Sequence, residues 1–178
     1  MKRRLMAVIV ALVMGLGLLV WPQGSYAATT KDQLIVINKQ TNQLAFFENG
    51  KLIKTYPVAT GRTPKLTPEG SFYVREKIVN RPYYKLHIKG GDPRNPLGNR
   101  WMGLSASEHG SYPYGIHGTN NESSIGKHIS GGCIRMHNKD VQELFAKIQT
   151  KAKVVIVTSK STLTAIAKPY LKVTVAKK

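Results

Sequence analysis

Short apolar segments separated by turn residues are the feature of this sequence that most limits its fold. Residues 34–37 and 44–47 are apolar runs joined by a short polar turn, and Asn49-Gly50 precedes a third run at residues 52–58. Asn-Gly is the strongest short hairpin signal, because both residues tolerate positive φ. Three such runs in succession predict an antiparallel β-meander.

The middle of the chain continues in the same way but contains one long irregular segment. Further strands are expected at residues 71–79, 101–105, 114–117 and 154–157. Residues 80–100 are rich in proline and glycine, which predicts a long loop. Long loops in compact domains often serve as binding loops or lids.

One stretch after residue 30 has a clear helical period. Val141, Leu144, Phe145 and Ile148 follow the spacing i, i+3, i+4, i+7, and Asn138 is the expected N-cap. Together with the strands, this predicts a mostly β domain with one or two helices.

The N-terminus resembles a secretory signal peptide at residues 1–27. A basic start precedes an apolar run at residues 5–20, and Ser25-Tyr26-Ala27 fits a small-x-small cleavage signal. The alternative is an uncleaved membrane anchor, although a bilayer span needs about 20 apolar residues. We therefore expect a secreted protein of the cell wall or periplasm, touching a membrane only if this segment is uncleaved.

The remaining sequence divides into a domain and a tail. Residues 31–158 carry all the regular patterns, whereas residues 159–178 form a basic tail dotted with apolar residues. Within the tail, residues 173–175 either add an edge strand or stay loose. No internal repeat is visible, so one domain and a monomer are expected.

The formal net charge of +18 favours polyanionic partners. The lysines are scattered and the chain carries no nucleic-acid motif, so export makes anionic wall polymers or lipid headgroups the expected partners rather than nucleic acid. The alternative is a solvated basic surface with no specific partner.

Cys133 is the single cysteine of the chain, so no internal disulfide can form. In a secreted protein a lone cysteine indicates intermolecular pairing or a reactive thiol. A third alternative is a buried, inert cysteine that acts as a small hydrophobe. The count alone leaves all three open.

The residues around Cys133 favour a nucleophile. A thiol nucleophile needs a base, such as His117, and backbone N–H donors for the developing oxyanion, such as those of Gly132 and Cys133. Two glycines before the cysteine allow a sharp turn. Arg135 would share a face with Cys133 in extended chain, where it could bind a substrate carboxylate or stabilise the thiolate.

A zinc site is the alternative for the same region. His117, His128, Cys133 and His137 could supply four ligands, but their spacing lacks the close ligand pairs of common structural zinc sites. The spacing therefore disfavours zinc.

The segments His117-Gly118-Thr119 and Ser130-Gly131-Gly132-Cys133-Ile134-Arg135-Met136 resemble the signature of the L,D-transpeptidase catalytic domain. The resemblance extends over residues 31–158 and includes the turn at 58–61 and the loop at 67–70. Many members carry histidine where this chain has Gly131, so any contribution of that ring is absent here.

The resemblance implies a β-sandwich-like domain with an active site under a loop lid, for which residues 80–100 are our candidate. It implies that Cys133 is the nucleophile, that His117 is the acid/base, and that the Gly118 carbonyl orients the imidazole. Arg135 and Ser130 would contact the substrate, and the resemblance implies neither a metal nor an organic cofactor.

The reaction implied is transfer between peptide stems of peptidoglycan. Cys133 would attack the carbonyl of the third residue of a donor tetrapeptide, release D-alanine and pass the acyl group to an amine of a neighbouring stem, giving a 3→3 cross-link. The alternatives are an L,D-carboxypeptidase or wall cysteine peptidase, and a non-catalytic basic wall-binding protein. The order of His117 before Cys133 favours the transpeptidase over the other wall peptidases.

Overall fold

The computed structural model describes residues 31–171, so the predicted signal peptide and the segment at 173–175 lie outside the described residues. Within residues 31–171, no helix is long and apolar enough to cross a membrane. The elements are β1 (Gln33–Asn38), β2 (Gln43–Glu48), β3 (Lys51–Pro57), β4 (Thr60–Gly61), β5 (Gly70–Val79), η1 (Tyr84–Leu86), β6 (Arg100–Leu104), β7 (Gly115–His117), η2 (Glu122–Ser124), β8 (His128–Ser130), β9 (Ile134–Arg135), α1 (Asn138–Lys147), β10 (Lys153–Val157), α2 (Leu163–Ala167) and η3 (Lys168–Tyr170).

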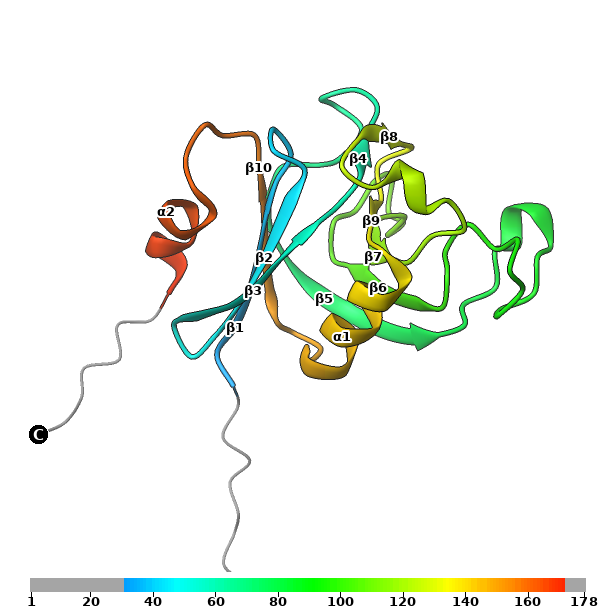
Figure 1. Ribbon diagram of the computed structural model, residues 1–178, viewed down its shortest axis with the longest axis horizontal. Helices are drawn as coiled ribbons and strands as arrows, with labels where there is room; N and C mark the ends of the chain where they lie inside the picture. Colours follow the sequence, from blue (N-terminus) through cyan, green and yellow to red (C-terminus); the bar gives the residue numbers. More distant parts are fainter. Residues whose placement is uncertain (1–30, 172–178) are drawn as a thin grey trace, which may run out of the picture. The chain divides into compact units, whose positions relative to one another are not determined.

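Eight of the strands form one sheet with the order β3-β2-β1-β10-β5-β6-β7-β9 (Figure 1). The predicted meander is confirmed, because β1 pairs antiparallel with β2 and β2 with β3, and the turn between β2 and β3 has Asn49 and Gly50 at positive φ. Two pairings in the sheet, β1 with β10 and β7 with β9, are parallel. The pairing of β7 with β9 matters for the site, because β7 ends at His117 and β9 begins directly after Cys133.

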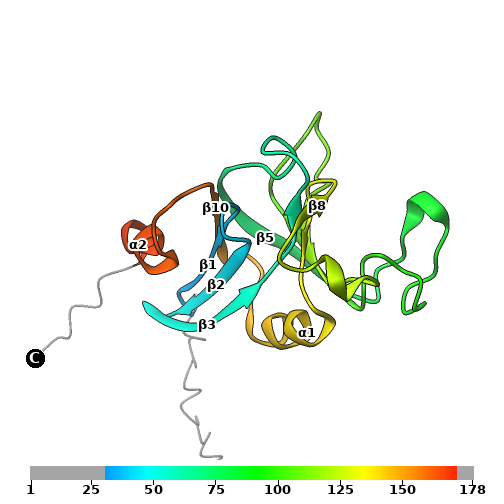
Figure 2. The ribbon, with the colours of Figure 1, turned by 45° about the horizontal axis from the view of Figure 1, so that its top comes forward.

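The sheet curls around a single large apolar core, as predicted for a mostly β domain. Ile35 and Phe46 from the β1–β3 side and Met102 and Ile116 from the β6–β9 side belong to the same buried cluster. The helix α1 closes one end of this core (Figure 2), with Val141 and other apolar residues of its predicted stripe pointing inward.

The predicted N-cap of α1 was wrong by one residue. The cap is His137, and Asn138 is the first helical residue. The Asn138 side chain is occupied elsewhere, because its Oδ1 accepts the Thr119 N–H at 3.2 Å. The Asn138 N–H instead donates to the carboxylate of Glu122 at 3.2 Å, so a distant acidic residue satisfies the helix start.

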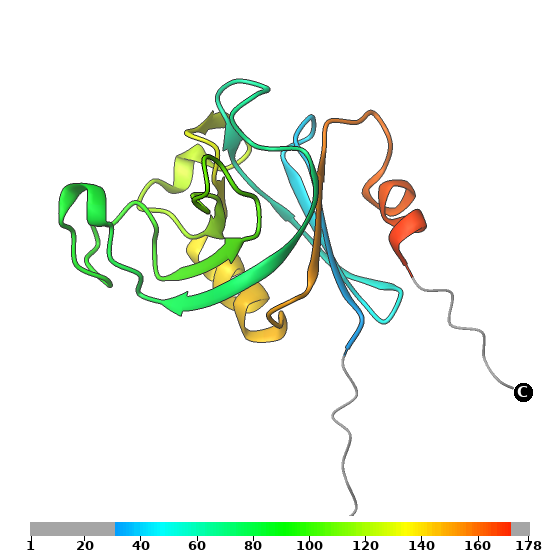
Figure 3. The same ribbon diagram turned by 180° about the vertical axis from the view of Figure 1, so that it is seen from behind.

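A second helix, α2, lies within the segment predicted as a tail. Figure 3 shows it beside the outer face of the sheet, away from α1. Its Ala167 belongs to a second buried cluster with Leu34 and Val36 of β1. Thr162 caps it by accepting the Ala165 N–H at 3.2 Å. Its five residues are too few for a helical period to stand out in the sequence.

Candidate active site

The sheet edge formed by β6, β7 and β9 brings together residues far apart in the sequence. Strand pairing sets Trp101 opposite His117, and His117 opposite Arg135. Neighbouring residues of a strand point to opposite faces. Ile116 and Ile134 are fully buried in the core, so Trp101, His117 and Arg135 lie on the other face of the sheet.

Cys133 sits directly before β9, two residues from Arg135, and is partly buried. Its Sγ donates a hydrogen bond to the Pro113 carbonyl at 3.5 Å. Burial raises the pKa of the Cys133 thiol, while a hydrogen bond from the Gly115 backbone and the charges of Arg135 and Arg81 oppose the rise. The thiol is therefore protonated in the resting protein at neutral pH.

The His117 imidazole is held on two sides. Its Nδ1 lies 2.7 Å from the Gly118 carbonyl oxygen, and its ring stacks on Trp101 with centroids 5.5 Å apart and planes inclined by 20°. A carbonyl can only accept, so Nδ1 carries the proton and Nε2 is the basic nitrogen. This leaves the imidazole in the tautomer that a general base requires.

Burial also decides the charge of His117, which is 3% exposed. Burial lowers its pKa to about 4; the charges of Arg135 and Arg81 add to this, and hydrogen bonds with the Gly118 and Leu97 backbone oppose it. The imidazole is therefore neutral at neutral pH. A neutral imidazole with an unprotonated Nε2 is the form that can take a thiol proton during attack.

The turn before Cys133 is closed by the side chain of Ser130, which is 1% exposed. Its hydroxyl donates to the Cys133 carbonyl at 2.6 Å and accepts the Gly132 N–H at 3.0 Å. The Ser130 hydroxyl therefore braces the turn through the backbone of Gly132 and Cys133. Of the two expected oxyanion donors, the Gly132 N–H is already used. The Cys133 N–H has no hydrogen-bond partner within residues 31–171.

Gly132 is required by the shape of this turn. Its φ is +132°, and a Cβ there would lie 2.4 Å from the Leu66 carbonyl oxygen and 2.8 Å from the Tyr114 ring. A Cβ on Gly131 would meet nothing within 4 Å. The two neighbouring glycines therefore differ sharply in what a side chain would cost.

Replacing Gly132 by alanine should destabilise the protein by about 2 kcal/mol, because of backbone strain and the clash with Leu66. The Gly131→Ala variant is the matched control and should unfold at the same urea concentration as the wild type. Urea denaturation of both variants checks this. Equal midpoints for the two variants would contradict the strain argument.

The backbone that holds His117 is itself fixed by Asn138. The Asn138 amide accepts the Thr119 N–H and donates to the Thr119 carbonyl at 2.7 Å. A Cβ on Gly118 would lie 2.2 Å from Asn138 Oδ1, so a side chain at this position would displace the Asn138 amide. This role of Asn138 does not show in the sequence pattern, although the glycine directly after His117 is a signal of close packing.

The other two histidines considered as zinc ligands lie elsewhere. His128 contacts the Thr60 hydroxyl at 3.0 Å and the Asn42 amide at 3.3 Å. His137 pairs with Glu122. Over residues 31–171, no three His, Cys, Asp or Glu side chains gather in an arrangement that could hold a metal ion.

The long segment between β5 and β6 reaches His117 through the Leu97 backbone. It contains one short 3-10 turn, η1, which confirms the irregular structure expected of it. The Arg81 guanidinium lies 4.4 Å from the Trp101 ring centroid, at the base of the segment. Asn95 is buried there and donates to the Arg81 carbonyl at 2.9 Å. Tyr84 and Leu86 are 67% and 63% exposed at the tip.

Comparison with known proteins agrees with this arrangement of elements. Residues 32–156 match the family described as YkuD, the L,D-transpeptidase catalytic domain. The chain is 47% identical over 137 residues to the Bacillus subtilis protein YqjB, and the match covers 77% of each chain. It is 42% identical over 122 residues to Bacillus subtilis YkuD, covering 68% of this chain and 64% of YkuD. Both relatives carry names that assign them to the L,D-transpeptidases.

The fold agrees with solved structures as well. An L,D-transpeptidase from Mycobacterium smegmatis superposes with a TM-score of 0.55 at 18% identity, over 72% of this chain and 59% of that chain. The chain belongs to the L,D-transpeptidase catalytic-domain family, a family of enzymes that act on peptidoglycan stems. The family assignment and the fold expected from the sequence are thereby confirmed.

Proposed function

We propose that this protein is an exported L,D-transpeptidase that forms 3→3 cross-links through a thioacyl link on Cys133. The observation that carries the proposal is the position of the His117 imidazole, which is oriented by the Gly118 carbonyl and lies on the strand next to the one that Cys133 precedes. This pairing supplies a nucleophile and a base without a metal or an organic cofactor.

The first half of the reaction acylates the enzyme. Cys133 Sγ attacks the carbonyl carbon of the third residue of a donor tetrapeptide, and His117 Nε2 takes the thiol proton. The Cys133 N–H stabilises the oxyanion. The C–N bond to the terminal D-alanine then breaks, and His117 returns the proton to the leaving amine.

The second half transfers the acyl group. The side-chain amine of the third residue of a neighbouring stem attacks the thioester, and His117 accepts its proton. The C–S bond breaks, and the proton returns to the thiol. Arg135, on the same face as His117, has the charge to bind a carboxylate of the donor stem.

The decisive experiment incubates the purified protein with muropeptides that carry tetrapeptide stems and follows the products by mass spectrometry. A dimer that has lost one D-alanine is the expected product. Loss of D-alanine without a dimer would identify an L,D-carboxypeptidase, and absence of both changes would falsify the proposal.

The proposed setting is outside the cytoplasm, with residues 1–27 acting as a cleaved signal peptide and the basic surface holding the enzyme near anionic wall polymers. The intact mass of the exported protein tests the first point. A mass that still includes Met1 to Ala27 would favour a membrane anchor instead.

The segment at residues 80–100 is proposed as a lid that excludes water from the thioester. Shortening its exposed tip around Tyr84 and Leu86 should raise hydrolysis relative to transfer, because water then competes with the amine. The ratio of free tetrapeptide-derived tripeptide to dimer measures this, and an unchanged ratio would count against a lid.

A further inference from the structure

We propose that Thr67 is a positioning residue that aims the Cys133 N–H at the reacting carbonyl, and that Lys39 holds Thr67 in place. The inference rests on the proposed acyl transfer at Cys133. Thr67 lies in the loop between β4 and β5, outside the residues that the reaction itself requires.

The Thr67 hydroxyl is buried behind the cysteine turn and is fully engaged. The side chain is 1% exposed. Its Oγ1 accepts the Gly61 N–H at 2.8 Å and donates to the Gly132 carbonyl at 2.9 Å. One hydroxyl thus ties the end of β4 to the residue that precedes the nucleophile.

The Gly132 carbonyl and the Cys133 N–H belong to the same peptide unit. In a planar trans peptide the C=O and the N–H point in opposite directions. A hydrogen bond from Thr67 to the carbonyl therefore fixes the direction of the N–H, which points away from the loop. It also polarises the peptide and makes the N–H a stronger donor. Gly132 has no side chain, so its backbone is freer than that of other residues. The hydrogen bond from Thr67 limits this freedom.

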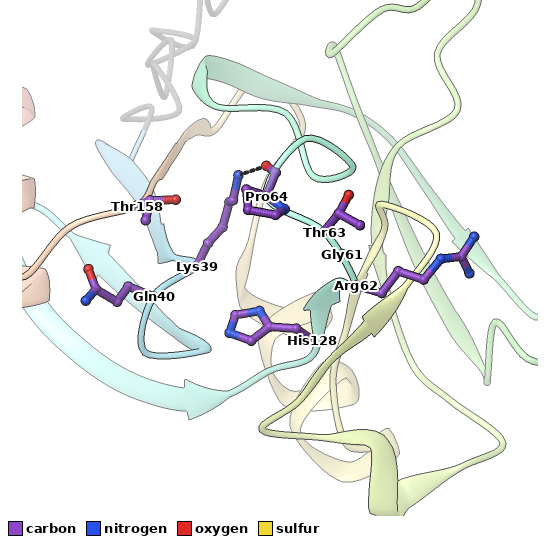
Figure 4. A pocket seen from close by; sticks show the side chains of 8 residues that line it. All are labelled: Lys39, Gln40, Gly61, Arg62, Thr63, Pro64, His128 and Thr158. Atoms are coloured by element: carbon purple, nitrogen blue, oxygen red, sulfur yellow. Dashed lines mark hydrogen bonds between the residues drawn. The ribbon is translucent and has the colours of Figure 1, made fainter.

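Lys39 makes the loop rigid at the other end. Its side chain is 6% exposed, and its Nζ donates to the carbonyls of Pro64 at 2.6 Å and Thr67 at 2.9 Å. The third bond goes to the Glu69 carboxylate at 2.9 Å, which also accepts the Thr158 hydroxyl at 2.7 Å. Figure 4 shows Lys39 with its amine at the Pro64 carbonyl, on the wall of a cavity of about 310 Å³.

This arrangement explains why a lysine is buried in a domain with so many exposed ones. A buried ammonium is costly unless its donors are all satisfied. Here three acceptors surround it, and two of them are carbonyls of the loop that carries Thr67. The loop is therefore tied to the turn after β1, and the position of Thr67 is set by the sheet.

The test separates oxyanion stabilisation from general damage to the site. Thr67→Val keeps the side-chain shape and removes both hydrogen bonds, Thr67→Ser keeps the hydroxyl, and Thr63→Val changes an exposed threonine of the same loop as a control. Two rates are measured for each: D-alanine release from a tetrapeptide muropeptide and alkylation by iodoacetamide. Alkylation develops no oxyanion and reports the reactivity of the only thiol in the chain.

Thr67→Val should lower kcat for D-alanine release by about 10- to 100-fold, below the loss expected when an oxyanion donor is removed outright. KM and the alkylation rate should stay unchanged, Thr67→Ser should recover most of the activity, and Thr63→Val should match the wild type. Equal kcat for Thr67→Val and wild type, or an equal fall in both rates, would overturn the positioning role. A wild type that is alkylated but releases no D-alanine would instead overturn the proposed function, and this inference with it.

Discussion

Replacing Cys133 by alanine should abolish D-alanine release, with a fall in rate of about 10⁴-fold or more. The thiol is the only cysteine sulfur in the chain, so no second nucleophile can take its place. The measurement is single-turnover release of D-alanine from tetrapeptide muropeptides. Intact mass should show an acyl adduct on the wild type and no adduct on the variant.

His117→Ala should cause a loss of similar size, because the thiol has a raised pKa and needs a base to take its proton. The matched control is His109→Asn, which changes an exposed histidine at positive φ, a conformation that asparagine tolerates. The control should keep the wild-type rate.

If Cys133→Ala keeps full wall-related function, the alternative of a non-catalytic basic wall-binding protein gains support.

Much of the fold follows from local sequence, because each strand of the meander is an apolar run with its own turn. The hairpin at Asn49 and Gly50 needs only two residues at positive φ, and the sequence supplies both. The parallel pairing of β1 with β10 is different, since it joins residues more than a hundred positions apart. Local patterns carry no information about such a pairing.

The residues of the candidate site also fall into those that the local sequence predicts and those that it does not. Cys133, His117 and the glycines lie close together in the sequence, so their grouping could be predicted from the motif. The residues that hold these segments in place come from elsewhere in the chain: Trp101 from the neighbouring strand, Asn138 from α1 and Thr67 from a distant loop. Each acts through a contact that forms only after folding. The motif does not predict the contacts of Ser130, whose hydroxyl bonds to the backbone of the turn.

Acid should destabilise this protein through His117 in particular. The imidazole has a pKa of about 4 in the folded protein and about 6.5 in the unfolded chain. Between these values the unfolded state binds the proton and the folded state does not, so stability falls as the pH is lowered. The groups that face the ring are the Arg135 and Arg81 charges and the Gly118 and Leu97 backbone. Burial and the two arginine charges outweigh the backbone hydrogen bonds, so the ring is neutral in the folded protein.

His117 should contribute about 3 kcal/mol to the free energy of unfolding, at 1.36 kcal/mol per pKa unit. This contribution is present above pH 6.5 and lost by about pH 4. Carboxylates titrate in the same range, so wild type is compared with His117→Gln, which removes only the imidazole. The free energy of unfolding from urea denaturation, measured from pH 7 to pH 4, should fall further for the wild type than for the variant. Parallel curves for the two proteins would show that the pKa of His117 is not lowered in the folded protein. The imidazole would then become charged below about pH 6.5 and could no longer take the proton of the Cys133 thiol in that range.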